Sequence, residues 1–433
     1  MTMSGLSLTR RHLMALSAAV ASTALAGRHA LAQGTELNVF GHKVHQAAAT
    51  GGPGGDATEA FRKQAGVNVS WVTLGDVNAI HERLLREATL ASTTIDVAYL
   101  LNGRAVPKNL RLFEPLDAFQ KEAPIEDFAD FAPGLVEPMR LDGALYGVPV
   151  RHATNAIVYN EAIFEERGVD PNFKSFEDMV EGMRKLTFKR ADGTQVYGLA
   201  FTPVFVSNFL SLSRCLGGEY MTPDRKVVAA EAPMVKALAV LADLYKQGVL
   251  PRGFATQNNE ELVTWIQQGR VAMSVQPYAR LVSYNDPQKS RYPGKIKPFL
   301  PPMAADLVGK ASYAPTVEFW SLVLTKNANN KRLAWDLVRA LSSKAGATAM
   351  ALNGNGPTRI STYNDPKLRE ASPFAAAEAK AIAAARIHLP AFDEQARAHD
   401  IFVEESQAAV IGMKPPQDAM ADATKRVRPL VGS

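Results

Sequence analysis

The stretch DGALYGVPVRHATNAIVYNEAIFEERGV, residues 142–169, decides how the fold of this chain is interpreted. A Gly-Pro-punctuated segment is followed by a second apolar segment, and both have the alternating apolar side chains that favour strands. Arg151 and His152 stand at the joint between the two segments. A cationic pair in such a position needs a reason, because a charge buried without partners is costly.

The size and composition of the chain limit the class of protein to which it can belong. It has 433 residues, of which 47 % are hydrophobic. This length is enough for two packed domains, and the composition excludes a disordered or fibrous protein. The formal net charge is +5 and falls by three if Arg10, Arg11 and Arg28 are removed with an N-terminal signal. So small an excess predicts no nucleic-acid partner.

The first 32 residues have the features of an export signal. The segment LTRRHLMALSAAVASTALAGRHALAQG, residues 8–34, contains the twin arginines Arg10 and Arg11 and an Ala-rich apolar run. It resembles a Tat signal peptide, which implies passage through the Tat translocase into a periplasm. Cleavage is expected after Ala32, with Ala26 as the alternative. A further hypothesis is that the segment stays uncleaved as a membrane anchor.

Cysteine usage is minimal. Cys215 is the single cysteine of the sequence, so an intramolecular disulfide is excluded. No cysteine lies near the signal to carry a lipid, so we expect a protein that is not lipid-anchored. Cys215 itself is expected to be a small buried hydrophobe.

Strand and helix patterns alternate along the chain after the signal. The first cycles predict strands at 35–41, 67–75 and 95–101 and helices at 57–66 and 81–92. This order predicts a parallel sheet covered by helices. Later, Ser175 is a predicted N-cap, and Pro233 and Gly248 bound a predicted helix. Further strands are expected at 270–278, 295–303 and 318–325, with helices at 331–343, 375–387 and 400–412.

Eight short motifs follow one another in an order that is similar to a known family. They are AFRKQAGVNVSWV (60–72), TIDVAYL (94–100), DGALYGVPV with IVYNEAIFEERGV (142–169), LGGEYM (216–221), LADLYKQGV (241–249), WIQQGRVAMSV (265–275), FLPPM (299–303) and NGPTR (355–359). Together they resemble the family 1 extracellular solute-binding proteins of ABC importers, the group that includes maltose-type sugar receptors. The resemblance covers nearly the whole chain after the signal.

The resemblance implies a two-lobed periplasmic binding protein fold of the α/β class. Each lobe would have a mostly parallel sheet flanked by helices, and crossing segments near Val150, Lys297 and Ser343 would form the hinge. The N-terminal lobe would then comprise residues 33–150 and 298–343, and the C-terminal lobe residues 151–297 and 344–433. Arg151 and His152 would lie at the floor between the lobes, where a ligand is enclosed.

Ligand-binding candidates come from the loop expected after the first strand and from the resemblance. The segment HKVHQAAATGGPGGD, residues 42–56, offers His42 and Lys43 together with glycines that let backbone N–H groups approach a ligand. The resemblance adds polar and aromatic positions in both lobes. They are Asn102, Arg104, Arg151, His152, Thr154, Phe205, Asn208, Tyr278, Trp320, Arg359 and His399.

Other residues are expected to be structural or to limit what the chain can bind. Trp71, Trp265 and Trp335 have apolar neighbours and are expected in the core. Glu318 and Phe319 replace glycines of the family pattern, and Leu100 and Tyr278 stand where many relatives have Trp. A platform for a long oligosaccharide is therefore not expected. His42 and His45 have no third ligand nearby, so neither a metal nor a cofactor is predicted.

The implied function is that of a monomeric periplasmic receptor that binds a small sugar or polyol and delivers it to ABC permease subunits. An anionic ligand such as a sugar acid or a phosphorylated polyol is the alternative, and Lys43, Arg104, Arg151, His152 and Arg359 motivate it. No G-x-S-x-G, P-loop, H-E-x-x-H or C-x-x-C motif is present. We therefore expect no enzymatic activity.

Overall fold

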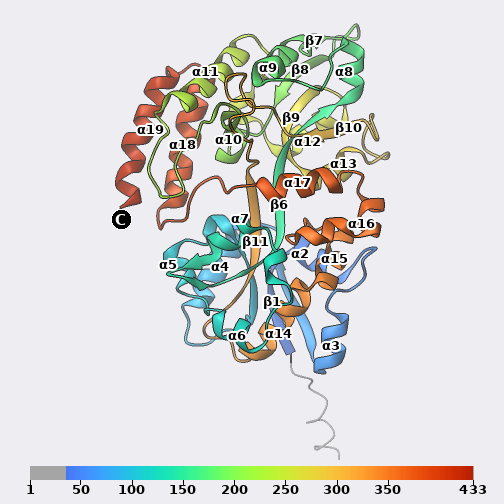
Figure 1. The fold of residues 1–433 in the computed structure, drawn as a ribbon, viewed down its shortest axis with the longest axis vertical. Coiled ribbons are helices and arrows are strands. Elements are labelled where there is room, and N and C mark those ends of the chain that lie inside the picture. Colours follow the sequence, from blue (N-terminus) through green and yellow to red (C-terminus); the bar gives the residue numbers. More distant parts are fainter. Residues whose placement is uncertain (1–35, 433) are drawn as a thin grey trace, which may run out of the picture.

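The computed structural model describes residues 36–432, which form two α/β lobes arranged along the long axis (Figure 1). The export signal predicted at 1–32 lies outside these residues. Strands β6 (Val148–Asn160) and β11 (Val317–Leu324) run along the middle of the molecule. They connect the sheet order β2-β1-β3-β11-β6-β9-β8-β7 through both lobes, with β10 paired to β6.

The first lobe is built on β1 (Glu36–His42), which pairs in parallel with β2 (Asn68–Leu74) and β3 (Val97–Leu101). Strand β11 closes this sheet antiparallel to β3. The larger helices of the lobe are α2 (Lys43–Thr50), α3 (Glu59–Ala65), α4 (Val77–Ala88), α14 (Lys331–Ser342) and α15 (Lys344–Leu352). Helix α3 ends where predicted, at Gly66, whose φ of 65° lies in the left-handed region.

Short elements fill the rest of the first lobe and the space beside the hinge. They are η1 (Asn102–Arg104), α5 (Pro107–Leu110), α6 (Asp117–Glu122), η2 (Phe128–Asp130), α7 (Pro133–Val136), η3 (Glu137–Met139), β4 (Arg140–Leu141), β5 (Ala144–Leu145), η7 (Ile360–Asn364), α16 (Pro366–Ala371) and α17 (Ala375–Ala384).

The second lobe uses the other half of β6 together with β7 (Phe188–Lys189), β8 (Gln195–Ala200), β9 (Val271–Pro277) and β10 (Ile296–Phe299). Helices cover this sheet: α8 (Glu161–Arg167), α9 (Phe176–Lys185), α10 (Val206–Ser213), α11 (Ala232–Lys246), α12 (Asn259–Gln267), α13 (Leu281–Tyr284), α18 (Gln395–Val410) and α19 (Pro416–Val431). Short 3-10 turns are η4 (Arg214–Leu216), η5 (Phe254–Thr256) and η6 (Tyr278–Arg280). The Ser175 cap is confirmed, since its side chain accepts from the Asp178 N–H.

The strand pairings suggest where the chain passes between the lobes. Strand β6 pairs with β11 up to Thr154 and with β9 from Asn155 onward. The return pass is at Thr316, which forms a bridge to Arg386 of the third pass. We propose these points as lobe boundaries in place of Val150, Lys297 and Ser343.

The proposed boundaries have a physical reason. Strand β10, which contains Lys297, still pairs with the second-lobe half of β6. Helices α14 and α15 flank Ser343, and both belong to the first core through side chains such as Trp335 and Met350. Proline pairs and helix ends mark turns, and a turn inside a lobe has the same local sequence as one between lobes.

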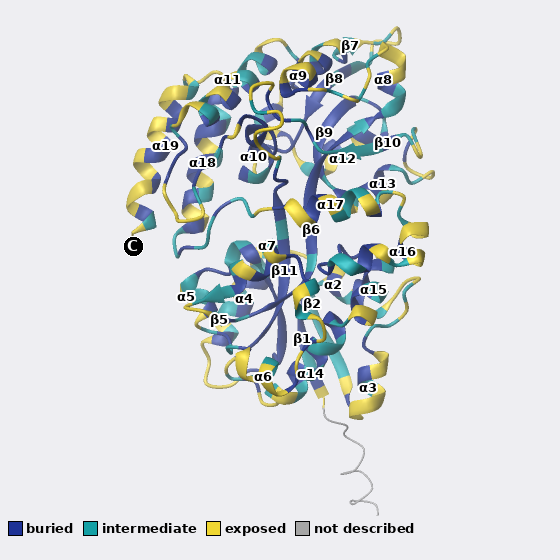
Figure 2. Cartoon of the chain, in the orientation of Figure 1, coloured by how far each residue is buried: buried dark blue, intermediate teal, exposed yellow. Residues whose placement is uncertain are grey.

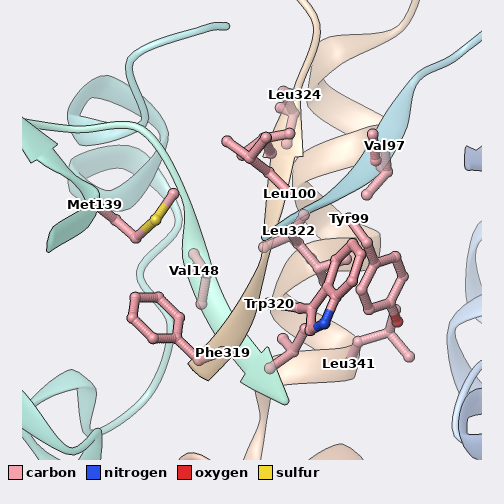
Figure 3. Close-up of a cluster of buried hydrophobic side chains, with 14 of the residues drawn as sticks. Val97, Tyr99, Leu100, Met139, Val148, Phe319, Trp320, Leu322, Leu324 and Leu341 are labelled. Carbon is pink, nitrogen blue, oxygen red and sulfur yellow. The ribbon is translucent and has the colours of Figure 1, made fainter. Parts of the chain in front are cut away.

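Each lobe has its own hydrophobic core (Figure 2). In the first core, Phe319 and Trp320 lie on opposite sides of β11, with Trp320 on the side of Tyr99 (Figure 3). The core position predicted for Trp335 is confirmed by its complete burial, whereas Trp71 and Trp265 are only partly buried at core edges. Within the described part of the chain, no helix combines the length and apolar content that crossing a bilayer requires.

Candidate ligand-binding site

The segment expected to be a loop after β1 contains a helix. Helix α2 begins at Lys43, directly after the strand, and His42 is its N-cap. The His42 Nδ1 accepts from the Val44 N–H at 3.1 Å and its Nε2 lies 2.8 Å from the Gly75 carbonyl, so both ring nitrogens are engaged. Lys43 is exposed. The run of alanines after His45 was the signal for helix, because alanine has the highest helix propensity.

Next to this helix start lies a group of rings that we call the imidazole–aromatic cluster: His45, His81, Tyr99 and Trp320. The His45 ring stacks on Tyr99 at 4.0 Å and meets Trp320 edge-on at 4.6 Å. His81 stacks on the indole of Trp320 at 5.2 Å. Of these residues only Trp320 was a predicted site residue. The alternation of strand side chains was the signal for Tyr99, but no local pattern pointed to His81.

The two histidines of the cluster are uncharged near neutral pH. Burial lowers the pKa of His45 well below its ordinary value, with Arg151 adding to the effect, and burial lowers that of His81 to about 4. Both nitrogens of His81 are bonded, to the Val77 carbonyl and to the Leu101 N–H. The His45 Nδ1 accepts from His42, but its buried Nε2 has no partner among residues 36–432. The cluster thus contains an unused N–H donor.

Arg151 lies beside the cluster. It stands opposite Trp320 in the β6–β11 register, so the two side chains share one face of the sheet. Its Nη1 donates to the Asn355 Oδ1 at 3.0 Å, and no carboxylate of the described residues is within ion-pair distance. Burial lowers its pKa. A guanidinium has five N–H donors, so Arg151 keeps most of them for a ligand.

Two predicted residues after β3 have different roles. Asn102 is buried, and its Oδ1 accepts from the Phe319 N–H at 3.0 Å, which ties η1 to β11. Arg104 is half-buried and donates to the Asn78 Oδ1 at 3.0 Å. Asn102 therefore positions the strands, whereas Arg104 stays accessible.

In the second lobe one predicted residue is exposed and two are buried. Phe205 is 45 % exposed, just before α10. Asn208 is buried, donates to the Thr202 carbonyl at 2.8 Å and accepts from Asn155 at 3.3 Å, so it braces the point where β6 changes partners. Tyr278 is buried at the end of β9.

His399 lies on α18, at the side of the molecule where the two lobes meet. This helix of the second lobe contacts η1 of the first. The pKa of His399 is lowered by burial, and the positive charge of Arg104 adds to that effect against the neighbouring carboxylate of Asp400. His399 and Arg104 are thus close enough to interact across the lobes.

His152 and Thr154 form a buried network at the hinge. The His152 Nε2 lies 2.6 Å from the Tyr363 hydroxyl, and its Nδ1 lies 3.0 Å from the Thr154 Oγ1. Burial lowers the pKa of His152 to about 3, so it carries no charge at pH 7. A Cβ on Gly356 would lie 2.2 Å from the His152 carbonyl, which explains the glycine at this close approach.

Arg359 is completely buried inside the first lobe. Its guanidinium donates to the carbonyls of Ser342, Asp127 and Glu126 and to the carboxylate of Asp130. It also lies over the Phe131 ring at 4.3 Å. The side chain has no exposed surface and four of its five N–H groups donate inside the protein, so Arg359 is not part of the proposed site.

A cavity of about 970 Å³ lies between the lobes, and we call it the hinge cavity. Its second-lobe wall comes from the region of Tyr278 and α13, and its first-lobe wall from the loop at Asn355 and from helices α16 and α17. Helix α17 packs on cores of both lobes and lies between them in Figure 1. Its carboxylate Glu378 faces this cavity and was not predicted from the sequence.

No metal is indicated. Among residues 36–432, no group of three or more His, Cys, Asp or Glu side chains is placed to hold an ion. Cys215 is buried, as predicted, and burial raises its pKa, so it is no thiolate ligand.

Residues 56–376 match the family described as bacterial extracellular solute-binding proteins. The chain belongs to this family. The family and the solute-binding role predicted from the sequence are thereby confirmed, and the family name places its members outside the cytoplasm. Over 403 residues the chain is 25 % identical to a probable amino-acid ABC transporter periplasmic-binding protein of Sinorhizobium fredii, with 89 % of each chain covered.

Solved structures confirm the two-lobed fold. Maltose-bound MalE3 of T. maritima has a TM-score of 0.75 at 23 % identity, covering 91 % of this chain and 99 % of that one. MalE of Xanthomonas citri has a TM-score of 0.76 at 22 % identity, covering 92 % and 98 %. A mannitol-bound receptor of Agrobacterium vitis has a TM-score of 0.72 at 19 % identity, covering 91 % and 97 %.

Proposed function

We propose that this solute-binding protein is the receptor of an ABC importer and captures a small neutral sugar or polyol between its lobes. The observation that carries the proposal is the imidazole–aromatic cluster with Arg151, where unused donors and ring faces lie together beside the β6–β11 connection. Receptors of the same fold hold maltose and mannitol, which supports this ligand class.

The chemistry of the proposed site suits hydroxyl groups. A hydroxyl that loses its hydrogen bonds to water on burial costs about 1–3 kcal/mol unless the site replaces them. Arg151 and the His45 Nε2 offer donors, and Trp320 offers an apolar ring that packs against C–H groups. Tyr278 would approach from the second lobe. Lys43, Arg104, Phe205 and His399 would form the rim, whereas His42, Asn102, His152, Thr154 and Asn208 would position the others.

The anionic alternative is not favoured. Of the cationic groups that motivated this alternative, His152 is neutral and Arg359 is hydrogen-bonded to internal partners. Lys43, Arg104 and Arg151 remain as charges without a carboxylate partner among the described residues, and Lys43 is exposed to solvent. Neutral ligands need donors, which a guanidinium supplies without requiring a counter-charge.

The ligand would be captured when the two lobes close about the segments that connect them. Contacts made from both lobes exist only when the lobes close, so a ligand shifts the hinge equilibrium by its differential affinity. Strand β6 exchanges β11 for β9 between Thr154 and Asn155, which makes this the natural pivot. The permease subunits would then recognise the closed receptor.

An amino acid is a second candidate ligand. Glu318 lies on the same face of β11 as Trp320, its carboxylate has no partner among the described residues, and burial raises its pKa. Together with Arg151 it offers opposite charges for a zwitterion. The relative in Sinorhizobium fredii, named as a probable amino-acid receptor, agrees with this candidate.

The remaining parts of the proposal concern location and state. We infer export through the Tat translocase, release into the periplasm without a lipid anchor, and a monomeric receptor without enzymatic activity. Fractionation of cells that express the full chain, with and without Arg10→Lys and Arg11→Lys, tests the export route. Retention of the precursor in the cytoplasm is the expected result for the double variant.

A thermal-shift screen of the chain from Gln33 tests the ligand class, because a ligand that binds only the folded state raises Tm. The panel contains maltose, mannitol, ribitol, free amino acids, sugar acids and glycerol phosphates. A response to neutral compounds that Arg151→Met abolishes and Arg339→Met retains supports the proposal. A response to amino acids alone selects the second candidate, and one confined to anions overturns both.

A further inference from the structure

The turn after η4 brings a carboxylate back onto Arg214 in the second lobe. Arg214 is 5 % exposed, and Glu219 follows it after the glycine pair of the LGGEYM motif. Gly217 has a φ of 76°, a left-handed conformation that strains other residues, and the chain reverses there. The Arg214 Nε and Nη2 donate to the two carboxylate oxygens of Glu219 at 2.9 and 3.2 Å. The pair is therefore bidentate, which fixes the plane of the guanidinium.

The same guanidinium binds two segments by which the chain passes between the lobes. Its Nη1 donates to the Ala314 and Pro315 carbonyls at 3.3 and 3.4 Å, just before β11. Nη1 also donates to the Arg386 carbonyl at 3.2 Å, and Nη2 donates to the Ile387 carbonyl at 2.9 Å, both after α17. We call these segments, 314–317 and 385–387, the later passes. All three guanidinium nitrogens are engaged, so Arg214 keeps little capacity for a ligand.

The backbone pairing between the later passes is short. Thr316 and Arg386 form an isolated bridge, in which the Arg386 N–H donates to the Pro315 carbonyl at 2.9 Å and the Val317 N–H to the Arg386 carbonyl at 3.1 Å. Strand β6 is attached at the same level, because the Asn155 N–H donates to the Thr316 carbonyl at 2.9 Å. The guanidinium extends this connection into the second lobe through backbone carbonyls on both segments.

Segments that are tied to one rigid group turn together. Arg214 is held in the second lobe, since the adjacent Cys215 and Leu216 belong to its core. It therefore fixes the later passes to that lobe as far as their bridge, and the backbone rotation of closure falls on the first-lobe side of this point. A free receptor with fewer accessible lobe angles loses less conformational entropy when the lobes close on a solute.

We propose that Arg214 and Glu219 form a clasp that limits the range of angles between the lobes and thereby raises the affinity for solute without contacting it. Arg386 joins the clasp from the third pass, since its Nη2 donates to the Glu219 Oε1 at 3.0 Å. Arg214 is thus a positioning residue, and it is absent from the walls of the hinge cavity. The effect on affinity rests on the proposed solute-binding function, whereas the limit on lobe angles does not.

The lobe angle is measured without any solute. Exposed positions on α6 and α11, one in each lobe, receive spin labels through Lys121→Cys and Ala239→Cys in the chain from Gln33. Cys215 is buried and stays unlabelled. Pulsed electron resonance then gives the distribution of distances between the labels for the parent chain, for Arg214→Met and for Arg214→Lys. The lysine keeps the charge but lacks the planar fork that binds several oxygens at once.

Arg190→Met is the matched control. Arg190 also joins a carboxylate, on Glu166 at 3.0 Å, to a carbonyl, on Gly269 at 3.0 Å, but both partners belong to the second lobe. At a temperature where circular dichroism shows the chains folded, we expect a wider distribution for Arg214→Met, an intermediate width for Arg214→Lys and the parent width for Arg190→Met. If Arg214→Met does not fold, Arg214→Lys carries the test. Parent widths in the Arg214 variants, or equal widening in Arg190→Met, overturn the proposal.

A second measurement concerns the solute. For the member of the thermal-shift panel that gives the largest response, titration calorimetry of Arg214→Lys should show an affinity about 2- to 30-fold weaker than that of the parent chain. The order of preference among the panel should not change. Unchanged affinity overturns the effect on capture, and a changed order of preference means that Arg214 contacts the solute and overturns its positioning role. Without a response from the panel, the proposed function fails, and the distance distributions still decide whether the clasp limits the lobe angle.

Discussion

Arg359 and Arg151 are both largely buried in the first lobe, but their surroundings are opposite. Arg359 has carbonyls, the Asp130 carboxylate and the Phe131 ring around its guanidinium. Arg151 has one hydrogen bond, to an amide oxygen. A buried cation with nearly all of its donors used stabilises the fold, whereas one with most of its donors unused remains open to a ligand. Residue type and burial alone do not distinguish the two.

The same contrast appears in the neighbouring acids. Burial opposes the ionisation of Asp130, but hydrogen bonds from Ser361 and Arg359 outweigh it and hold the pKa of Asp130 below its ordinary value. Burial acts on Glu378 without such compensation, and its pKa is raised to about 7. The Arg359 region thus has satisfied charges, and the hinge region has unsatisfied ones.

The largest effect is expected for Arg359→Met. The change leaves Asp130 and several carbonyls without their donor, so the free energy of unfolding should fall by about 3–5 kcal/mol. Denaturant unfolding measures the loss. Arg332→Met, which removes an exposed pair with Glu122, is the control and should cost under about 1 kcal/mol. Equal costs for the two variants would remove the distinction between the regions.

The second largest effect is expected in how the stability of Glu378→Gln depends on pH. Between the ordinary pKa of 4.5 and the raised value of about 7, the folded wild type binds more protons than the unfolded chain, so its stability falls as pH rises. The variant lacks this loss and should be more stable than the wild type above pH 7, by up to about 3 kcal/mol. Below pH 4.5 the difference should vanish.

Unfolding of both proteins from pH 4 to pH 8 measures that difference. His152, whose lowered pKa has the opposite effect on stability, is present in both chains and cancels. If the difference in stability did not change with pH, Glu378 would have a partner that stabilises its charge. The hinge region would then resemble the Arg359 region.

A smaller effect is expected for Arg151→Met. Loss of charged hydrogen bonds to a ligand should weaken binding by about 10- to 100-fold, while stability changes by about 1 kcal/mol or less because only the Asn355 contact is lost. Calorimetry with the ligand found in the screen and denaturant unfolding give both quantities. A large loss of stability with unchanged affinity would make Arg151 a second structural arginine.

Lys43→Met should have the smallest effect. The side chain is exposed at the start of α2, so the free energy of unfolding should change by less than about 0.5 kcal/mol. Affinity for a neutral ligand should change by less than about threefold, since a solvated charge at the rim contributes little. A tenfold loss in the same calorimetric assay would bring the first turn of α2 into the solute site.

Local sequence patterns were enough to predict the class of fold and most of its helices and strands. The strand–helix alternation predicted the parallel sheet of the first lobe, and the helix ends at Gly66 and Ser175 were found from their capping residues. The helix α2 was missed because glycines after Thr50 drew attention to a loop. The lobe boundaries are proposed from strand pairing and not from the sequence, because a turn within a lobe and a turn between lobes have similar composition.

By itself, the sequence determined the family, the two-lobed α/β architecture and the position of Arg151 at the joint between apolar strands, because periodicity, caps and motif order are local properties of a chain. The tertiary structure alone decided that Arg359 is internal, that His152 is neutral, and that His45, His81 and Tyr99 gather around Trp320. It also placed Glu378 at the hinge without a counter-charge. Whether a polar group is satisfied depends on partners distant in the sequence, and only folding brings those partners together.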